Sequence, residues 1–367
     1  ETAPMLAAIS QAIHAHALLA PDVDYLVRDG RVELIDENKG RLAQGRRWPE
    51  GLQAAVEARE GVDLRHAGRV LASVTVQSFV GLYPSVCGMT GTAARQAAEL
   101  RELYGLEVVV VPTHRPVLRR DQADVVLPSR EEKEQRIVAE VQAAHAEGRP
   151  VLLGTASVAD SESLGRRLAA AAIPHQILNA RHEAAEAEIV RQAGRPGAVT
   201  VSTNMAGRGT DILLGGDPPE GREAEVDLGG LLVLGTTRHE SRRIDDQHRG
   251  RAGRQGDPGE SRFILSLEDD LFARYGLGAE TDLDHAQRVI EGQHLEVRLN
   301  LHKYDRMLEQ QRRMVHARRR EVLLGEAEST LREADLERYR ALCDEAGEAE
   351  VRRAERDVTL TAIDGAW

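Results

Sequence analysis

The stretch that decides the fold is Gln247-His248-Arg249-Gly250-Arg251-Ala252-Gly253-Arg254-Gln255-Gly256-Asp257. Arginines and glycines alternate here at the predicted end of a helix over 241–250. Glycine has no Cβ, so the backbone and the neighbouring guanidinium groups can approach a ligand closely. Arg251 and Arg254 would share a face on a helical turn. Two guanidinium groups on one face suit phosphate oxygens, which accept paired hydrogen bonds from arginine. The alternative is a solvated, arginine-rich turn.

A second glycine-rich segment, Thr203-Asn204-Met205-Ala206-Gly207-Arg208-Gly209-Thr210-Asp211, follows a predicted strand. Gly207 and Gly209 leave the backbone free to approach a ligand. Asp211 can accept a hydrogen bond from a ribose hydroxyl, or orient an attacking water through a solvent network. Arg208 can pair across a domain cleft. The alternative is an ordinary loop in which Asp211 caps the next helix.

A third segment, Gly88-Met89-Thr90-Gly91-Thr92-Ala93, precedes a predicted helix over 94–104 and the apolar run 108–111. Taken alone it is weak evidence for function, because Thr92 is also a suitable helix N-cap.

These segments resemble the motifs of one group of motor proteins. The order Gln-x-x-Gly-Arg-x-Gly-Arg, from Gln247 to Arg254, resembles motif VI of the superfamily-two helicase motors. The longer run 238–257 resembles one branch of them, the SecA family, whose members are ATPase motors of bacterial protein export. The segments 203–211 and 88–93 then resemble motifs V and III, in the expected order.

The resemblance implies a role for each matched residue. It implies that the catalytic residues are Arg251 and Arg254, which contact the γ-phosphate. It implies that the ATP-binding residues are Gly207, Arg208, Gly209 and Asp211. It implies that ATP state is coupled to domain movement by Thr90, Gly91, Thr92 and Gln247. No residue is predicted to be a metal ligand. Histidines 182, 239 and 248 are expected to be ordinary polar residues, since 239–243 lacks the second histidine of a zinc motif.

Residues 116–275 alternate between predicted strands and helices, as in a parallel α/β sheet domain. The predicted strands are 151–154, 176–179, 199–202, 231–234 and 263–265, and the predicted helices are 131–147, 161–172, 183–193 and 241–250. The strands are almost continuously apolar, which suits a sheet covered on both faces. Ligands of such sheets bind at the carboxyl ends of the strands, where we expect both the arginine run and the segment 203–211.

From residue 283 the pattern changes to one long helix. A narrow stripe of the coiled-coil kind steps by three and four residues through Ile290, His294, Val297, Leu301, Tyr304, Leu308, Gln311, Val315, Arg318 and Val322. A basic cluster lies on the same helix at Arg312, Arg313, Arg318, Arg319 and Arg320. It is either a solvated face or a surface for anionic lipid or a partner. The predicted fold class is therefore α/β, with RecA-like parallel-sheet domains followed by an all-α scaffold built on a long helix.

The resemblance implies four parts. Residues 1–37 would end the preprotein cross-linking domain, with a helix over 5–20 and a hairpin around Asp29-Gly30. Residues 38–115 would be the C-terminal part of the first nucleotide-binding domain, with a helix over 50–60, and residues 116–278 the second. Residues 279–367 would be the helical scaffold, truncated at its C-terminus. A short Glu- and Arg-rich stretch stands where the family has a larger wing domain, which indicates an accessory SecA with a reduced wing.

The composition limits the class of protein. The chain has 367 residues, 41% hydrophobic and 29% charged, as in a folded globular protein of more than one domain. Its net charge of −12 and its 3% aromatic content argue against a nucleic-acid-binding surface. Two cysteines, Cys87 and Cys343, fit a reducing cytoplasm. No run approaches the roughly 18 apolar residues of a membrane span, and no signal peptide is visible.

The sequence holds neither a Gly-x-x-x-x-Gly-Lys-[Ser/Thr] motif nor a Walker B acidic pair, which hold the β-phosphate and Mg²⁺. The SecA family carries both earlier in the first nucleotide-binding domain. We therefore expect a C-terminal part of a longer motor, inactive alone, whose Mg²⁺ is held mainly by the upstream segment.

The resemblance predicts a motor that couples ATP hydrolysis to movement of preproteins through a membrane channel. Its cofactors would be ATP and Mg²⁺. Its partners would be preproteins and a SecYEG-type channel, with anionic phospholipid and a homodimer left open and no nucleic acid. It would be cytoplasmic and associated with the inner face of the cell membrane. The alternatives are a superfamily-two nucleic-acid helicase and a non-catalytic, motor-like binding module.

Overall fold

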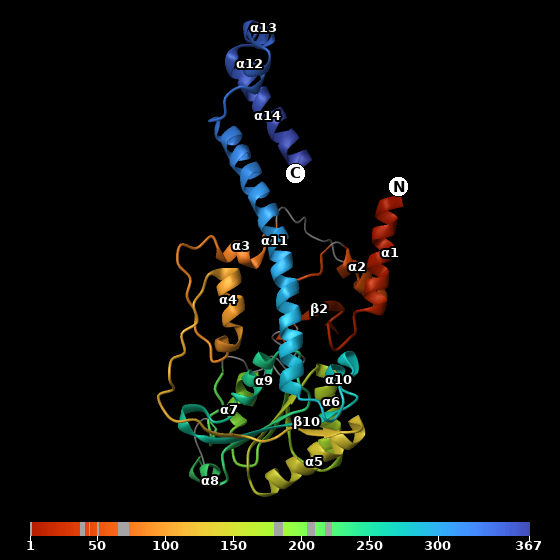
Figure 1. Ribbon diagram of the computed structural model, residues 1–367. Coiled ribbons are helices and arrows are strands. Elements are labelled where there is room, and N and C mark those ends of the chain that lie inside the picture. The colour runs from red at the N-terminus through yellow and green to blue at the C-terminus, as the bar shows by residue number, and fades with distance from the viewer. Residues whose placement is uncertain are drawn as a thin grey trace. The chain divides into compact units, whose positions relative to one another are not determined.

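The computed structural model describes residues 2–36, 41–43, 45–49, 51–64, 73–179, 186–203, 210–216 and 222–367 (Figure 1). The chain divides into two compact units. The first consists of Glu1–Leu71, Gly88–Ala98 and Glu107–Gly292, and the second of Ala72–Cys87, Glu99–Leu106 and Gln293–Trp367. Among the described helices, none is both long and apolar enough to cross a membrane.

The first unit begins with a small α/β module. Its elements are α1 (Thr2–Ala17), β1 (Tyr25–Arg28), β2 (Arg31–Asp36), β3 (Arg41–Leu42) and α2 (Leu52–Arg59). Strands β1 and β2 pair antiparallel around Asp29 and Gly30, both of which have positive φ, so the predicted hairpin is confirmed. Tyr25 is fully buried in the core of this module, and its hydroxyl donates to the Glu60 carboxylate over 2.5 Å.

The middle of the chain supplies short helices and then a sheet with its covering helices. In chain order the elements are α3 (Val76–Val80), η1 (Ala93–Gln96), α4 (Ala97–Tyr104), β4 (Leu118–Asp121), β5 (Val125–Leu127), α5 (Arg130–Ala146), β6 (Val151–Thr155), α6 (Val158–Ala170), β7 (Gln176–Leu178), α7 (Glu186–Gln192), β8 (Val199–Thr203), α8 (Arg222–Asp227), β9 (Leu231–Gly235), α9 (Arg242–Arg249), η3 (Arg254–Gly256), β10 (Pro258–Ser266) and α10 (Asp270–Tyr275). The run 108–111 forms no strand, and Val109, Val110 and Val111 are largely exposed.

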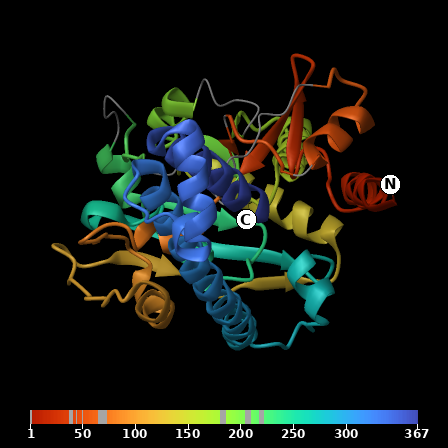
Figure 2. The same cartoon turned by 90° about the horizontal axis from the view of Figure 1, so that it is seen from above.

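The central sheet has seven strands in the order β4-β10-β9-β6-β8-β7, and β5 also pairs with β10. Its pairings are parallel (Figures 1 and 2). The five predicted strands are present, and the predicted α/β class is confirmed. Strands β4 and β5 are additions that the sequence pattern did not indicate.

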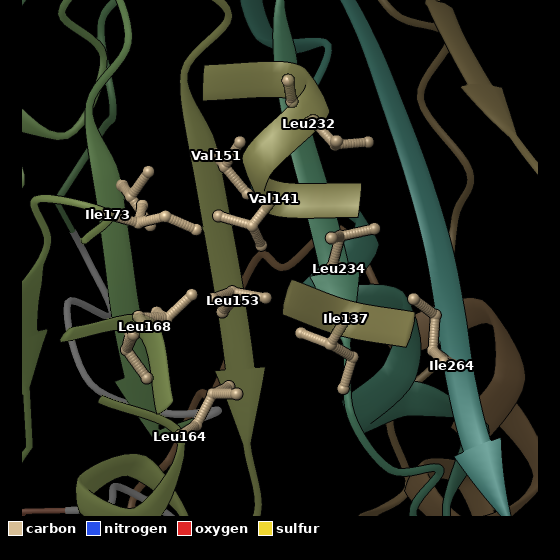
Figure 3. Packing of buried hydrophobic residues seen from close by; sticks show 13 residues of the cluster. Ile137, Val141, Val151, Leu153, Leu164, Leu168, Ile173, Leu232, Leu234 and Ile264 are labelled. Carbon is tan, nitrogen blue, oxygen red and sulfur yellow. The ribbon is translucent and has the colours of Figure 1, made fainter. Parts of the chain in front are cut away.

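Side chains alternate between the two faces of the sheet, and each face has its own core. Leu232 and Leu234 of β9 point to the face of the sheet that α5 and α6 cover, with Ile137 of α5 near β9 and Leu168 of α6 on the far side of β6 (Figure 3). Leu231 and Val233 of the same strand join the opposite core, which includes Val190 of α7. A strand with apolar residues on both faces must be covered on both faces, which explains the continuous apolar runs.

The connections place a topological switch point between β6 and β9. These two strands are neighbours in the sheet. Helix α6, which follows β6, packs on one face through Leu164 and Leu168. The chain leaving β9 through α9 packs Ala252 on the other face. A crevice at the carboxyl ends of such a strand pair is the usual ligand site of open α/β sheets.

The second unit is helical. Helix α11 runs over Leu283–Leu324, as predicted, and its first residues, up to Gly292, belong to the first unit. It is followed by α12 (Thr330–Ala334), α13 (Leu336–Ala346) and α14 (Glu348–Ala366). The predicted apolar stripe is largely uncovered by the described residues, since Val297, Leu301, Tyr304 and Leu308 are each more than half exposed.

The predicted basic cluster of α11 is largely paired with carboxylates. Arg312 and Arg313 both donate to Glu309, and Arg319 forms two hydrogen bonds with Asp364 of α14. Arg318 contacts Glu321 at 3.3 Å. This pairing favours the solvated-face alternative over a surface that attracts anionic lipid.

Candidate functional site

The arginine run forms an irregular turn rather than a helical face. Helix α9 ends at Arg249, before either predicted catalytic arginine. Gly253 adopts a left-handed conformation with φ of 70°, which ends helical geometry before Arg254 begins η3. The expectation that Arg251 and Arg254 share a helical turn is therefore wrong.

The two arginines nevertheless converge on one place. Arg254 donates from Nη1 to Asp211 Oδ1 over 3.0 Å, and from Nε to the Gly250 carbonyl over 2.8 Å. Arg251 lies 3.4 Å from the Thr210 carbonyl oxygen and is only 8% exposed. Both guanidinium groups thus contact the end of the segment that resembles motif V.

The arginine turn lies at the amino end of the sheet, which corrects the predicted location. Helix α9 leaves the carboxyl end of β9 and returns along the sheet. The turn after it leads directly into Pro258, the first residue of β10, and Gly259 pairs with Leu231 at the amino end of β9. The expectation that the arginine run lies at the carboxyl ends of the strands is wrong, because helix α9 separates the run from β9 and carries the chain back along the sheet.

Close packing fixes the shape of this turn. A Cβ on Gly253 would lie 2.6 Å from the Cβ of Arg119 on β4. A Cβ on Gly259 would lie 2.6 Å from the Gly253 nitrogen. These glycines are therefore needed for backbone approach between the turn and the edge of the sheet, rather than for approach to a ligand alone.

The segment that resembles motif III contacts α9 itself. Gln247 Nε2 lies 3.4 Å from Thr92 Oγ1, and the Thr92 hydroxyl is 3.3 Å from that of Thr90. Arg95 forms an ion pair with Asp246. Thr92 is the residue before η1 but makes no side-chain cap bond, so its hydroxyl is available to Gln247. The structure thus brings together Thr90, Thr92 and Gln247, with Gly91 in the same turn.

The segment that resembles motif V is described in part. Gly207, Arg208 and Gly209 lie outside the described residues. Asp211 is described, and its carboxylate pairs with Arg254 well before α8 begins at Arg222. The described contact of Asp211 is therefore an ion pair with Arg254 and not a helix cap.

A buried charge network, which sequence reasoning missed, supports the start of α9. Arg238 is 7% exposed, pairs with Asp124 and Asp245, and lies with its guanidinium carbon 4.7 Å from the Phe263 ring centroid. Arg249 lies over the same ring at 5.0 Å. Burial lowers the pKa of Arg238, but the neighbouring carboxylates outweigh it and hold the pKa above its usual value. Arg238 is therefore a permanent buried cation.

His248 is an uncharged part of this helix. Its ring Nε2 lies 3.3 Å from the Leu234 carbonyl oxygen. Burial lowers the pKa of His248 to about 4, so the ring is neutral near pH 7 and donates to that carbonyl. Histidine as a polar, hydrogen-bonding residue agrees with the sequence interpretation.

The crevice at the switch point is a separate feature. It is lined at the strand ends by Thr155 of β6 and Thr236 after β9. Its charged lining residues are Arg130, Lys133, Glu134, Asp160, Asp269 and Asp270. Lys133 is buried, ion-paired with Asp269 and bonded to the Thr236 carbonyl at 3.1 Å. Carboxylates therefore outnumber cations in this crevice.

The parallel sheet, covered by helices on both faces, places this domain in the RecA-like α/β class. Comparison with known families specifies it further. The family model described as the SecA P-loop domain matches residues 116–227 and 220–289, the SecA preprotein cross-linking domain matches 1–57, and the SecA Wing and Scaffold domain matches 279–347. The chain belongs to the SecA family, as the resemblance predicted.

Individual relatives agree. "Protein translocase subunit SecA 2" of Thermobifida fusca is 48% identical over 385 aligned positions, covering 100% of this chain and 50% of the relative. "Protein translocase subunit SecA 2" of Corynebacterium diphtheriae is 46% identical, covering 99% and 50%. "Protein translocase subunit SecA" of Desulforapulum autotrophicum is 47% identical, covering 88% and 40%. The chain thus spans about half the length of these relatives.

Proposed function

We propose that this chain is part of an ATP-driven motor that moves preproteins through a membrane channel during protein export. ATP would bind between the RecA-like domain described here and a domain that carries the Walker motifs. The convergence of Arg251 and Arg254 on the segment 210–211 supports this proposal most strongly. A pair of arginines held by the protein is what stabilisation of a transferring phosphoryl group requires.

The two arginines are suited to different tasks. Arg254 has a side chain 39% exposed. Its Nη1 is bonded to Asp211 and its Nε to the Gly250 carbonyl, so Nη2, which has no partner among the described residues, is the nitrogen left for phosphate oxygens. Arg251 is buried, and its contact with the Thr210 carbonyl is long at 3.4 Å. Arg254 would contact the γ-phosphate directly, and Arg251 would join it when the domains close. Mg²⁺, held by the Walker-bearing domain, would neutralise charge on the phosphate oxygens.

Asp211 holds Arg254 before nucleotide arrives. One of its carboxylate oxygens accepts from the guanidinium group and favours one position for it, while the second oxygen can still accept a hydrogen bond from a ribose hydroxyl. Gly207, Arg208 and Gly209 remain proposed nucleotide-binding residues. Thr90, Gly91, Thr92 and Gln247 remain proposed coupling residues, because they connect α9 to a separate segment of the chain.

Steady-state ATPase kinetics test this proposal. A SecA protein that contains this sequence with a Walker A motif should lose turnover by about 10³-fold or more on Arg254→Ala, as for other phosphoryl-transfer arginines. Nucleotide affinity should change far less. Arg136→Ala is a control, because Arg136 is 51% exposed on α5, which packs on the opposite face of the sheet from Ala252 of the turn. Unchanged turnover in Arg251→Ala and Arg254→Ala would refute the proposed mechanism.

The 367-residue chain alone is expected not to hydrolyse ATP, because its sequence has no Walker A lysine to hold the β- and γ-phosphates. A phosphate-release assay on the purified chain, with the Walker-containing SecA protein beside it, checks this expectation. Turnover above the no-protein background would show that the missing motifs are not needed.

The switch-point crevice weighs against a nucleic-acid helicase. Phosphate backbones bind cationic surfaces, yet the crevice carries Glu134, Asp160, Asp269 and Asp270 against Arg130 and an already paired Lys133. A strand-unwinding assay with DNA and RNA duplexes tests the alternative. ATP-dependent unwinding would replace preprotein transport as the proposed function.

The remaining partners follow from the family. We propose preproteins as the substrate and a SecYEG-type channel as the membrane partner, with the motor on the cytoplasmic side. An accessory role fits the relatives named SecA 2 and the short stretch between α11 and α14. The sequence left homodimer formation and anionic phospholipid binding open, and both stay open. The part boundaries at 37, 115 and 278 also stay predictions.

A further inference from the structure

Helix α11 contacts the start of α9, whose other end carries the arginine turn. We propose that Glu291 and Gln287 of α11 are positioning residues for Arg251 and Arg254, acting through α9. This inference rests on the proposed function, because it assigns the two residues a part in ATP turnover. Its first step is that α11 fixes the position of α9, and this step depends only on the contacts between the two helices.

Glu291 supplies the cap that α9 lacks. Ser241 is the N-cap residue of α9, but its side chain makes no cap bond within the helix. Instead Glu291 Oε1 accepts the Arg242 backbone N–H over 2.7 Å and lies 3.4 Å from Ser241 Oγ. A carboxylate at this position satisfies an otherwise unpaired N–H and faces the positive end of the helix dipole.

The same carboxylate fixes the direction of the first turn. Glu291 Oε2 accepts from Arg242 Nε at 2.9 Å and from Nη2 at 2.7 Å. Both side chains are 16% exposed, so water competes weakly for these two charge-assisted hydrogen bonds. One glutamate of α11 therefore binds both the backbone and the side chain of Arg242.

Gln287 makes a second attachment one turn earlier in α11. It is fully buried and donates to Asp245 Oδ2 over 2.7 Å and to the His239 carbonyl over 2.5 Å. Asp245 in turn binds Arg238 and the His239 backbone N–H, at 3.0 Å each. Gln287 thus connects α11 to the buried charge network of Arg238 and Asp245.

Helix α9 can transmit a displacement because it is short. Its eight residues span about 12 Å. Its first turn is held by α11, and its last residue is followed directly by Gly250 and Arg251. A shift of α11 at Glu291 would therefore move the arginine turn. Displacements of about 1 Å in a catalytic group can lower turnover by about 10²-fold.

Hydrogen exchange in the 367-residue chain tests the first step. Glu291→Gln keeps the size of the side chain but loses its charge, and should speed exchange of the amides of 242–245 by about two- to thirty-fold, the range of a lost helix cap. Gln287→Leu should speed exchange in the same segment. Glu296→Gln is the control, because Glu296 lies exposed on the same helix. Unchanged exchange at 242–245 in Glu291→Gln overturns the inference, whatever the turnover.

ATPase kinetics of a Walker-containing SecA protein test the second step. Glu291→Gln and Gln287→Leu should each lower kcat by about ten- to one-hundred-fold while KM stays within about two-fold. Faster exchange with unchanged kcat would show a role in stability alone and would overturn the inference. Loss of kcat in Glu296→Gln to the same extent would do so too. A wild-type protein without ATPase activity would refute the proposed function, while the exchange result would still report whether Glu291 holds α9.

Discussion

The guanidinium group of Arg254 and the carboxylate of Asp211 are joined by a 3.0 Å hydrogen bond between segments 43 residues apart in the chain. Their side chains are 39% and 33% exposed, so the pair lies at the surface, where a ligand can reach it. A surface ion pair of this kind contributes little to stability. The pair instead orients Arg254, because the bond to Asp211 favours one position of the long and flexible arginine side chain.

Asp211→Asn should therefore lower ATP turnover of a Walker-containing SecA protein by roughly ten-fold, equal to about 1.4 kcal/mol of lost transition-state stabilisation. Because Asp211 would act through Arg254, the losses of turnover caused by Asp211→Asn and Arg254→Ala should not add. The double variant with Arg254→Ala should turn over no more slowly than Arg254→Ala alone. A double-mutant cycle on kcat checks this. Additive losses would mean that Asp211 acts on the nucleotide independently of the arginine.

Three of the five strands that the sequence predicted share one physical cause. β6, β8 and β9 are each buried along their whole length, so every position is under the same selection for apolar or small residues. β4, with the sequence Leu-Arg-Arg-Asp, is an exposed edge strand. Its pairing comes from the backbone of β10, which leaves no signal in the side chains of Leu118–Asp121.

The residues proposed for the site came from the sequence and stay predictions, whereas their geometry could be seen only in the structure. The motif order brought out Arg251, Arg254 and Asp211 because each lies close to glycines in a segment of motif type, and Gln247 because it is the first residue of the motif VI pattern. The helix end before Arg251 could have been predicted from Gly250 and Gly253, since glycine commonly ends helices. The contact of Glu291 with Arg242 could not, because nothing local marks a pair separated by 49 residues.

Gly259→Ala should destabilise the first unit. The added Cβ would lie 2.6 Å from the Gly253 nitrogen and 2.9 Å from the Ala252 Cβ, and neither is a flexible side-chain end. Overpacking of this kind costs about 1–3 kcal/mol, which a urea unfolding curve followed by circular dichroism would measure. Gly278→Ala is the matched control, because no atom lies within 4 Å of its Cβ position. Equal midpoints for both variants would contradict the close approach of the turn and β10.

Glu225 of α8 should make the chain less stable as the pH rises. Its side chain is fully buried, with one oxygen accepting from the Gly215 N–H and the other without a partner among the described residues. Burial raises the pKa of Glu225 to about 7, above its ordinary value near 4.5. The folded state therefore holds a proton that the unfolded state has released, and stability is lost as pH rises from about 4.5 through 7.

Glu225→Gln removes this titration. Thermal unfolding should show little difference from wild type at pH 5 and a more stable variant at pH 8, by at most about 3 kcal/mol. Glu223→Gln, an exposed change on the same helix, should leave the pH dependence as it is. A wild-type protein whose stability is flat between pH 5 and pH 8 relative to Glu225→Gln would show that the buried carboxyl keeps an ordinary pKa.

His248 should make the chain less stable as the pH falls below 6.5. Its folded pKa of about 4 lies below the ordinary value of 6.5, so the unfolded state binds a proton first as the pH falls. The stability that His248 contributes is fully present above pH 6.5 and is lost between pH 6.5 and pH 4, by roughly 3 kcal/mol over that window. His248→Gln keeps a donor for the Leu234 carbonyl and cannot titrate. Its stability relative to wild type should therefore rise steadily as the pH falls from 6.5 to 4, while the exposed His285→Gln should follow wild type. Urea unfolding at several pH values measures this difference, and a constant difference across the window would mean that the buried ring accepts a proton as readily as one in water.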